Sequence, residues 1–260
     1  MSMQKIKPES FKNYIGYIDP DACGKVYPRS VAESVQTGDI FINSRKDNLS
    51  VLYWHYCGFA FLCGVCDKPF LEEVYGFMSD KKNTANRRFI LFADNKPVER
   101  FFRAKSGTVF EERYFFEYDK SCPVIDAALP AGYKLCEIDE KFAEKIDGKI
   151  TPSFSWDDYN SFIEKGKGYL ITDGENAAAW AFSAAVSADE IDIGIETDVR
   201  YRNHGFAYIV AQKMIEYSLN QHKMPVWACN AANAASYNLA MKLGFTKVSE
   251  CCTVRIKDGK

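Results

Sequence analysis

The sequence contains little histidine and almost no net charge. Only 3 of its 260 residues are His, and 33 Lys and Arg against 35 Asp and Glu leave a formal net charge of −2. With only three histidines, few residues could serve as the base of a Ser–His–Asp catalytic triad. The motifs Gly-x-x-x-x-Gly-Lys-Ser/Thr, Gly-x-Gly-x-x-Gly and Gly-x-Ser-x-Gly are also absent. A balanced charge provides no electrostatic footprint for nonspecific nucleic-acid binding. We therefore expect no nucleic-acid partner.

Long apolar runs are absent as well. The longest apolar stretch, residues 51–66, contains His55 and two glycines. It is shorter than the roughly 20 residues that a membrane-spanning helix requires. The first residues of the sequence lack the apolar segment of a secretory signal. We expect a cytoplasmic protein that does not contact a membrane.

Nine cysteines are present, without the spacing of a disulfide framework. A zinc site would use His55, Cys57, Cys63 and Cys66, because Cys63-Gly-Val-Cys66 has the spacing of a zinc knuckle or a redox motif. The surrounding stretch alternates as a strand does, and no second Cys pair follows it. This pattern favours reduced thiols buried in a strand, and we predict no metal.

The alternation of strand-like and helix-like segments predicts a mixed α/β protein. Its length corresponds to about one to two domains of roughly 150 residues. Residues 119–131, which contain two prolines, are the best linker candidate. We predict an N-terminal α/β lobe over residues 1–125 and a second domain over residues 126–260. In the second domain, Ser155 is expected to cap a helix over residues 156–165.

Three strand-like runs in the second half are expected to form a meander that ends at a basic loop. The runs cover residues 168–172, 177–186 and 190–197. Residues 198–205 then lead into an amphipathic helix that starts near Gly205. The first N–H groups of a helix and its dipole attract an anion, and a glycine lets a phosphate approach the backbone closely. This segment predicts an anion-binding loop.

A second strand and helix follow this loop. Pro225 is expected to end the preceding helix, and residues 226–229 to form a strand. Asn233 suits a helix N-cap, with Ser236 in the first turn. Gly244 suits the C-terminal cap of the same helix. The second half thus predicts a strand–loop–helix unit followed by a strand–helix–strand unit.

Three motifs in this half resemble the GCN5-related N-acetyltransferase (GNAT) superfamily. They are Arg202-x-x-Gly205-x-Ala207, Asn233-x-x-Ser236 and Lys242-Leu-Gly244-Phe245. Neighbouring runs, including Ile193-Gly-Ile-Glu-Thr197, resemble the GNAT group that includes zwittermicin A resistance acetyltransferases. The resemblance covers roughly residues 129–254. It implies a mixed, mostly antiparallel GNAT sheet flanked by helices. The order of elements expected in residues 1–125 (strand, strand, helix, strand, helix, strand) suggests that this lobe is either an acceptor-side lobe or a degenerate GNAT-like half.

The resemblance also implies that the chain binds acetyl-CoA as acyl donor. The strand before the loop would hydrogen-bond the pantetheine arm through its backbone at Ile195, Glu196 and Thr197. The loop would wrap the pyrophosphate with the N–H groups of Arg202, Asn203, His204, Gly205, Phe206 and Ala207. Asn233 and Ser236 would lie beside the cofactor arm, where two central strands splay. From the residues alone, Asn233 also suits a plain helix cap and His204 a solvated loop residue.

Acetylation of an amine requires the neutral amine, so a base is expected near the end of this strand. Glu196 and Asp192 are the candidates, because side chains alternate along a strand and these two share a face. Glu196 lies nearer the loop. Many family members carry a tyrosine as thiolate acid five residues before the Phe of the Gly-Phe pair, but here that position is Ala240. Tyr237, one helical turn earlier, either replaces that acid or packs in the core.

The favoured function is the transfer of an acetyl group from acetyl-CoA to an amine, which we expect to be that of a small molecule. A protein N-terminus or lysine is the second enzymatic option. The departure at Ala240 also leaves open an alternative of another class, a non-catalytic acyl-CoA-binding or regulatory protein.

Overall fold

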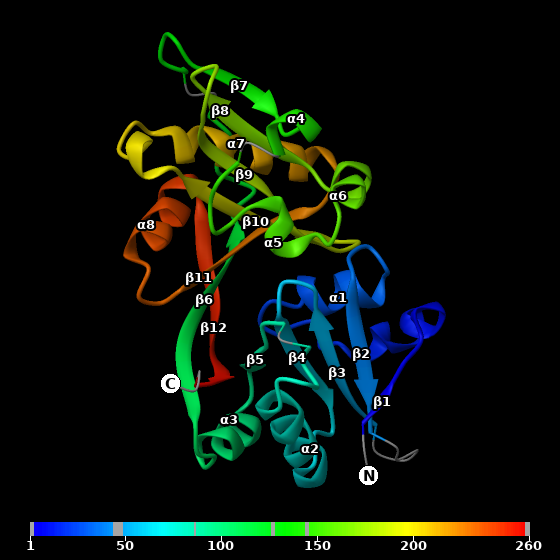
Figure 1. The fold of residues 1–260 in the computed structure, drawn as a ribbon. Helices are drawn as coiled ribbons and strands as arrows, with labels where there is room; N and C mark the ends of the chain where they lie inside the picture. Colours follow the sequence, from blue (N-terminus) through cyan, green and yellow to red (C-terminus); the bar gives the residue numbers. More distant parts are fainter. Residues whose placement is uncertain (1–2, 44–48, 86, 126–127, 144–145, 258–260) are drawn as a thin grey trace. The chain divides into compact units, whose positions relative to one another are not determined.

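The computed structural model describes residues 3–43, 49–85, 87–125, 128–143 and 146–257, in which strands alternate with helices (Figure 1). The helices are η1 (Pro8–Tyr17), α1 (Val26–Ala32), α2 (Lys68–Ser79), α3 (Lys96–Arg103), α4 (Glu140–Ala143), α5 (Pro152–Ser155), α6 (Tyr159–Lys165), η2 (Val199–Tyr201), α7 (Phe206–Asn220) and α8 (Ala234–Leu243). The strands are β1 (Gln4–Lys5), β2 (Gly38–Ile42), β3 (Ser50–His55), β4 (Phe59–Gly64), β5 (Ile90–Ala93), β6 (Thr108–Tyr118), β7 (Lys134–Glu137), β8 (Gly168–Thr172), β9 (Ala177–Val186), β10 (Glu190–Thr197), β11 (Met224–Asn230) and β12 (Phe245–Ile256).

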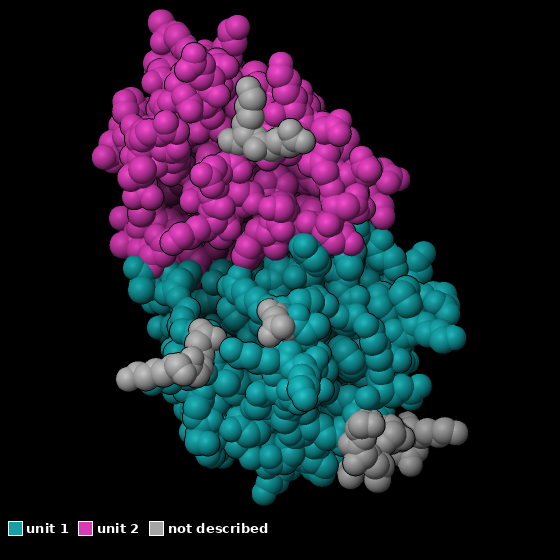
Figure 2. Space-filling model, in the orientation of Figure 1, with its two compact units in different colours: residues 1–115, 230–232, 249–260 teal, residues 116–229, 233–248 magenta. Residues whose placement is uncertain are grey.

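Two compact units divide the structure, and neither is a continuous half of the chain (Figure 2). Unit 1 comprises residues 1–115, 230–232 and 249–260, and unit 2 comprises residues 116–229 and 233–248. The division cuts the long strands β6 and β12, because β5 pairs with the end of β12 whereas β6 lies beside β11. The domain boundary near residue 125 stays a prediction, and it adjoins residues 126–127, which are outside the described residues.

Unit 1 contains the strands β1-β2-β3-β4-β5 in this order, followed by residues 249–256 of β12 and residues 108–115 of β6. β4 and β5 pair in parallel, whereas the pairs β1–β2, β2–β3, β3–β4 and β5–β12 are antiparallel. Helices α2 and α3 bury their apolar sides in one core with Leu52, Trp54 and Leu91 of the strands. Helix α2 starts after Asp67, whose carboxylate accepts a hydrogen bond from the N–H of Phe70 at 3.0 Å. An acidic side chain therefore occupies the start of this helix.

Unit 2 contains the strands β11-β10-β9-β8-β7 in this order, preceded by residues 245–248 of β12 and residues 116–118 of β6. The alanine-rich strand β9 is buried along its whole length and pairs antiparallel with both β8 and β10. Helix α7 runs across one face of these strands and buries Phe206, Val210 and Met214 (Figure 1). The mixed, mostly antiparallel sheet flanked by helices that the sequence predicts is confirmed.

The two units repeat one order of elements. In unit 1 the meander β2-β3-β4 leads into α2, then into β5, which is parallel to β4, and then into α3 and β6. In unit 2 the meander β8-β9-β10 leads into α7, then into β11, which is parallel to β10, and then into α8 and β12. The amino-acid sequence shows no repeat at a short fixed period. The two units share the order of their strands and helices and the directions of their strands, and these do not require similar residues.

Local predictions agree with the structure where the pattern is long and periodic. The strands predicted at residues 177–186 and 190–197 have the same bounds as β9 and β10. The predicted Ser155 cap is wrong, since Asp158 caps α6 by accepting a hydrogen bond from the Ser161 N–H at 2.9 Å. Pro225 does not end a helix either. It lies in β11, opposite Ile191 of β10.

The His55–Cys66 segment forms part of the core of unit 1. Burial lowers the pKa of His55 to about 3, so the ring is neutral, and its Nδ1 accepts a hydrogen bond from the Cys57 N–H at 3.1 Å. Burial raises the pKa of Cys63 and that of Cys66 to about 12, which keeps both as thiols. Cys57 and Cys63 are buried free cysteines, as the sequence pattern favours, and Cys66 is partly buried.

Among the described residues, no helix is both long enough and apolar enough to cross a membrane. The cytoplasmic location stays a prediction.

Helix α3 provides a test of the fold of unit 1. The side chain of Asn95 caps it by accepting a hydrogen bond from the Val98 N–H at 2.9 Å. We expect Asn95→Ala to lower the free energy of unfolding by about 1 kcal/mol, because the cap is lost. Urea unfolding measures the change. Asn95→Ser keeps an acceptor and serves as the control, and an equal loss in both variants would contradict the cap.

Candidate functional site

The two central strands of unit 2 separate after a short parallel pairing. Glu190, Ile191 and Asp192 of β10 lie opposite Met224, Pro225 and Val226 of β11. Both strands continue past these pairs, β10 to Thr197 and β11 to Asn230. On its other side, β10 stays paired with β9 through to Thr197. The backbone edge of β10 at Ile195–Thr197 that faces away from β9 is therefore available to a ligand.

The predicted anion-binding loop lies directly after β10. It consists of η2 and residues 202–205 and ends at the N-cap of α7, Gly205. Asn203 and Gly205 both have left-handed backbone conformations, with φ of 67° and 79°. A Cβ built on Gly205 would meet no heavy atom within 4 Å, so the space beside this backbone is open. Like the first N–H groups of any helix, those of α7 have no acceptor within the helix. They therefore need an acceptor from outside it.

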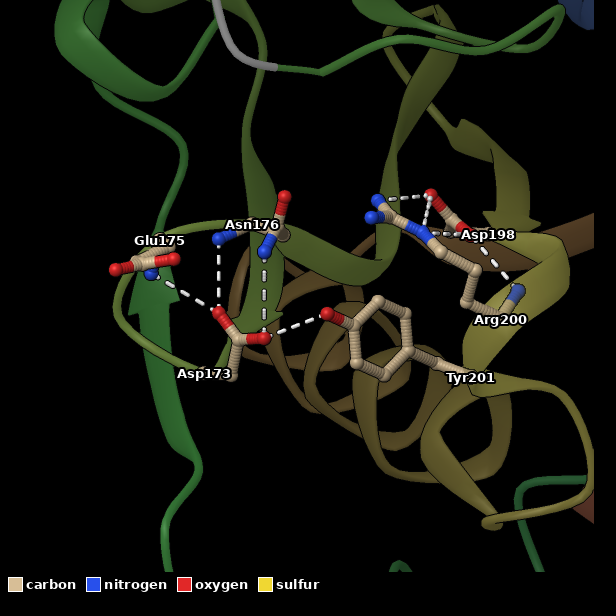
Figure 3. A network of polar contacts seen from close by, with 6 residues as sticks. All are labelled: Asp173, Glu175, Asn176, Asp198, Arg200 and Tyr201. Atoms are coloured by element: carbon tan, nitrogen blue, oxygen red, sulfur yellow. Dashed lines mark hydrogen bonds and ion pairs between the residues drawn. The ribbon is translucent and has the colours of Figure 1, made fainter.

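A polar network links this loop to the turn between β8 and β9 (Figure 3). The hydroxyl of Tyr201 donates to the Asp173 carboxylate at 2.5 Å, and the N–H groups of Glu175 and Asn176 donate to the same carboxylate. The Tyr201 hydroxyl and these N–H groups hold the pKa of Asp173 below its usual range. The network therefore anchors the residue immediately before Arg202.

A second contact within the loop is the ion pair between Asp198 and Arg200. Both Nε and Nη2 of Arg200 donate to the Asp198 carboxylate, at 3.1 and 2.8 Å (Figure 3). The guanidinium lowers the pKa of Asp198. Arg202 is exposed, and no ion pair to it occurs within the described ranges. Its charge is therefore available to an anion, whereas that of Arg200 is already neutralised.

Aromatic rings pack around the start of α7. The ring of Phe206 lies 4.6 Å from that of Tyr133 and 5.5 Å from that of His204, measured between centroids. The Nδ1 of His204 lies 2.9 Å from the carbonyl oxygen of Arg202. This places the ring proton of neutral His204 on Nδ1, where it donates to the loop itself. His204 thus contributes to the shape of the loop.

Asn233 and Ser236 lie at the start of α8 and have local partners. The Oδ1 of Asn233 accepts a hydrogen bond from the Ser236 N–H at 3.1 Å, which is the predicted N-cap. The Ser236 hydroxyl accepts a hydrogen bond from Nε1 of the buried Trp227 at 3.0 Å. The cap is confirmed, and the role of both residues beside a cofactor stays a prediction.

Glu196 holds a neighbouring loop through backbone hydrogen bonds. Its Oε2 accepts from the N–H groups of Lys149 and Ile150, each at 2.7 Å. Trp180, opposite Glu196 on β9, donates through Nε1 to the Ile150 carbonyl at 2.7 Å. Gly148 fits between the two side chains, since a Cβ there would lie 2.5 Å from Trp180 and 2.6 Å from Glu196. One carboxylate oxygen of Glu196 is therefore engaged by the protein.

The other candidates for proton transfer are buried to different extents. Asp192 is 5% exposed and lies at the last β10–β11 pair, and a register shift with β9 follows it. Ala240, at the position where the acid is expected, is fully buried in α8. The ring of Tyr237 packs edge-on against Phe116, with centroids 5.6 Å apart. Of the two carboxylates, Glu196 is the more accessible.

Several contributing residues were not identified from the sequence. Asp173, Tyr201, Trp180 and the backbone at residues 148–150 shape the site through contacts between segments distant in the chain. No periodicity or spacing marks such contacts. The local sequence places Asp173 in a turn and Trp180 in a strand. It carries no signal for their contacts in the site. Within the described residues, no group of three or more His, Cys, Asp or Glu is arranged to hold a metal ion.

Comparisons with known proteins extend over almost the whole chain. Residues 25–253 match the model of the family described as GNAT acetyltransferase. A relative from Bacillus subtilis (strain 168), named as the uncharacterized N-acetyltransferase YdfB, is 22% identical over 253 residues, which are 95% of this chain and 96% of the relative.

Solved structures of related proteins share the fold. The structure of a GCN5-related N-acetyltransferase-like protein from Streptococcus suis 89/1591 has a TM-score of 0.74 at 20% identity, and it covers 96% of this chain and 100% of that one. A tandem GNAT protein from the clavulanic acid biosynthesis pathway has a TM-score of 0.63 at 10% identity, with complete coverage of both chains.

The bond between Tyr201 and Asp173 provides a titration test. We expect Tyr201→Phe to raise the pKa of Asp173, because a donor to the charged form is lost. A carboxyl group whose pKa is lower in the folded than in the unfolded state stabilises the folded state at pH values above the unfolded-state pKa. This stabilisation is lost as the pH falls through the folded-state pKa. The variant should therefore be less stable than the wild type at neutral pH, and the difference should diminish in acid. Carboxyl ¹³C NMR titration and urea unfolding measure the two effects. Tyr133→Phe is the control, and an unchanged Asp173 pKa in Tyr201→Phe would refute the link.

Proposed function

This chain belongs to the GNAT acetyltransferase family, and on that premise we propose that it transfers an acetyl group from acetyl-CoA to an amine of a small molecule. The family predicted from the three motifs is confirmed, and the match extends into the first half of the chain, beyond the predicted residues 129–254. The narrower likeness to zwittermicin A resistance acetyltransferases stays a prediction.

The observation that carries the proposal is the open backbone at the start of α7 beside the free edge of β10. Gly205 leaves space next to the first N–H groups of a 15-residue helix. Helix starts of this kind bind phosphate groups through backbone donors and the helix dipole. The β10 edge at Ile195–Thr197 offers donors and acceptors to an extended chain such as a pantetheine arm. A ligand that carries both a phosphate group and an extended chain with amide groups fits these two sites. Acetyl-CoA carries both groups.

We assign the cofactor site to unit 2 rather than unit 1. The equivalent helix start in unit 1, that of α2, is capped by the Asp67 carboxylate and has Pro69 in its first turn. The carboxylate repels a phosphate, and proline has no N–H to donate. Unit 1 is therefore proposed to be a GNAT-like half without this cofactor loop.

For the chemical step we propose Glu196 as the base. The amine nitrogen attacks the thioester carbonyl carbon, the amine proton passes to Glu196, and the C–S bond breaks to release the CoA thiolate. With Oε2 held by two backbone N–H groups, Oε1 is the oxygen left to accept the proton. Asp192 is the second candidate, and its burial makes it less accessible.

A second candidate function is acyl-CoA binding without transfer. The specific observation in its favour is the fully buried Ala240 in place of a thiolate acid, with Tyr237 packed against Phe116. In that case acetyl-CoA binds, but no amine releases CoA. A protein N-terminus or lysine remains the alternative acceptor for an active enzyme.

Calorimetric titration with acetyl-CoA tests the cofactor site. We expect the wild type to bind and Gly205→Glu to lose binding, because the new side chain fills the open space and repels the pyrophosphate. Saturation at about 100 times the Kd should also stabilise the wild type by about 2.7 kcal/mol. Gly107→Glu is the matched control, since Gly107 also has a left-handed φ, of 71°, and open space beside it. Absence of binding by the wild type would overturn the assignment.

A pair of substitutions at Glu196 separates catalysis from loop positioning. If Glu196 is the base, both Glu196→Gln and Glu196→Ala should lower kcat about 10²- to 10⁴-fold, with the KM for acetyl-CoA little changed. The assay is CoA release across a panel of amines. Gln retains an acceptor for the Lys149 and Ile150 N–H groups, so a kcat kept in Glu196→Gln but lost in Glu196→Ala would show positioning alone.

A further inference from the structure

A segment of unit 2, residues 148–150, lies directly against the proposed base Glu196. Gly148 and Lys149 are exposed, and Ile150 is half-buried. The segment belongs to no helix or strand, so the hydrogen bonds of regular structure do not hold it. It also lies 46 residues or more before Glu196 in the chain. Its position therefore depends on side chains of the neighbouring strands.

Trp180 anchors this segment to strand β9. Its Nε1 donates to the Ile150 carbonyl oxygen at 2.7 Å. The Trp180 side chain is buried, and Trp180 is the residue of β9 that pairs with Glu196 of β10. Residues directly opposite each other in a sheet carry their side chains on the same face, close together. The indole therefore holds the segment beside Glu196.

The anchored segment in turn fixes the Glu196 carboxylate. The N–H groups of Lys149 and Ile150 both donate to its Oε2, each at 2.7 Å. Hydrogen bonds to an ionised carboxylate are shorter and stronger than those between neutral groups. A glutamate side chain without such partners samples several rotamers. The two bonds select one orientation, in which Oε1 is left to accept the proton of the amine.

The close approach of the segment depends on Gly148. A Cβ at this position would lie 2.5 Å from the Trp180 ring and 2.6 Å from Oε2 of Glu196. Ordinary contacts between carbon atoms are about 3.5–4.0 Å, so a side chain here would have to displace one of these groups. Glycine lets the backbone pass between the two side chains. Both sets of hydrogen bonds then form at once.

We propose that Trp180 and Gly148 are positioning residues for the acetyl transfer, which act through residues 148–150 on the orientation of Glu196. This inference rests on the proposed function, in which Glu196 is the base. Trp180 holds the segment, and the segment holds Oε2. A reacting group misplaced by about 1 Å can slow a reaction on the order of 100-fold. The efficiency of Glu196 is therefore set by residues that do not contact the substrate.

Trp180→Phe tests the anchor, because phenylalanine keeps an aromatic ring but has no N–H. We expect kcat for CoA release to fall about 10- to 100-fold, with the KM for acetyl-CoA little changed. We also expect the Lys149 and Ile150 amide protons to exchange with solvent at least about tenfold faster, because the segment opens more often. NMR of the full-length protein measures this exchange and requires neither acetyl-CoA nor an amine.

Trp156→Phe is the matched control. Trp156 is also buried in unit 2, and its Nε1 donates to a backbone carbonyl at a different place, that of Ser183, at 2.8 Å. The control loses the same kind of hydrogen bond, so kcat and the exchange of the Lys149 and Ile150 amides should stay near those of the wild type. Equal changes in the two variants would indicate a general loss of packing and would overturn the proposal.

Gly148→Ala tests the same arrangement at an exposed position, where folding does not depend on a buried ring. The new Cβ should displace the segment or the Glu196 carboxylate, with the same fall in kcat and the same faster exchange. Gly76→Ala is its control, since a Cβ at Gly76 would meet no heavy atom within 4 Å. This control should behave as the wild type.

The outcomes separate this inference from the proposed function. A kcat near that of the wild type in Trp180→Phe or Gly148→Ala would overturn the positioning role, whatever the exchange rates. Unchanged exchange in both variants would overturn the anchor. A wild type that releases no CoA with any amine would overturn the proposed function and with it the role of Trp180 in the reaction, whereas the exchange rates would still show whether Trp180 anchors the segment.

Discussion

The parallel pairing of β10 with β11 requires a crossover, and helix α7 is that crossover. Two parallel neighbours have to be joined by a long connection, which in this sheet places a helix start at the end of β10. The pairing also ends after Asp192 opposite Val226, while both strands continue. One strand arrangement thus places the backbone edge of β10 beyond Asp192 and the start of helix α7 in neighbouring segments of the chain. The polar contacts of Asp173 with Tyr201 and of Glu196 with residues 149–150 hold the loops next to this strand end and this helix start.

Unit 1 shares this strand arrangement but not the open helix start. β4 and β5 are also parallel and joined by a helix, α2. There the helix start is closed by the Asp67 carboxylate, whereas α7 starts at Gly205 with open space beside it. The two helix starts thus differ in local electrostatics, because a carboxylate at a helix start disfavours a second anion there, whereas an open helix start favours one.

The sequence predicts those parts of the molecule that depend on local patterns. β9, β10, the Asn233 cap and the Gly205 turn follow from alternation, spacing and backbone conformation within a few residues. The predicted Ser155 cap of α6 is wrong because Ser155 is the last residue of the short helix α5, and Asp158, also a good capping residue, caps α6. The contacts of Glu196 with residues 149–150 span 46 residues or more and have no local signal.

Polar contacts join the loops on either side of the separated strands to neighbouring segments. Asp173 and Tyr201 tie the anion-binding loop to the β8–β9 turn, and Glu196 with Trp180 ties residues 148–150 to β10 and β9. The core beneath them contains β9, which is buried along its whole length. Solved structures at 10–20% identity share the fold, and in proteins generally loops vary more than the strands and helices that they connect.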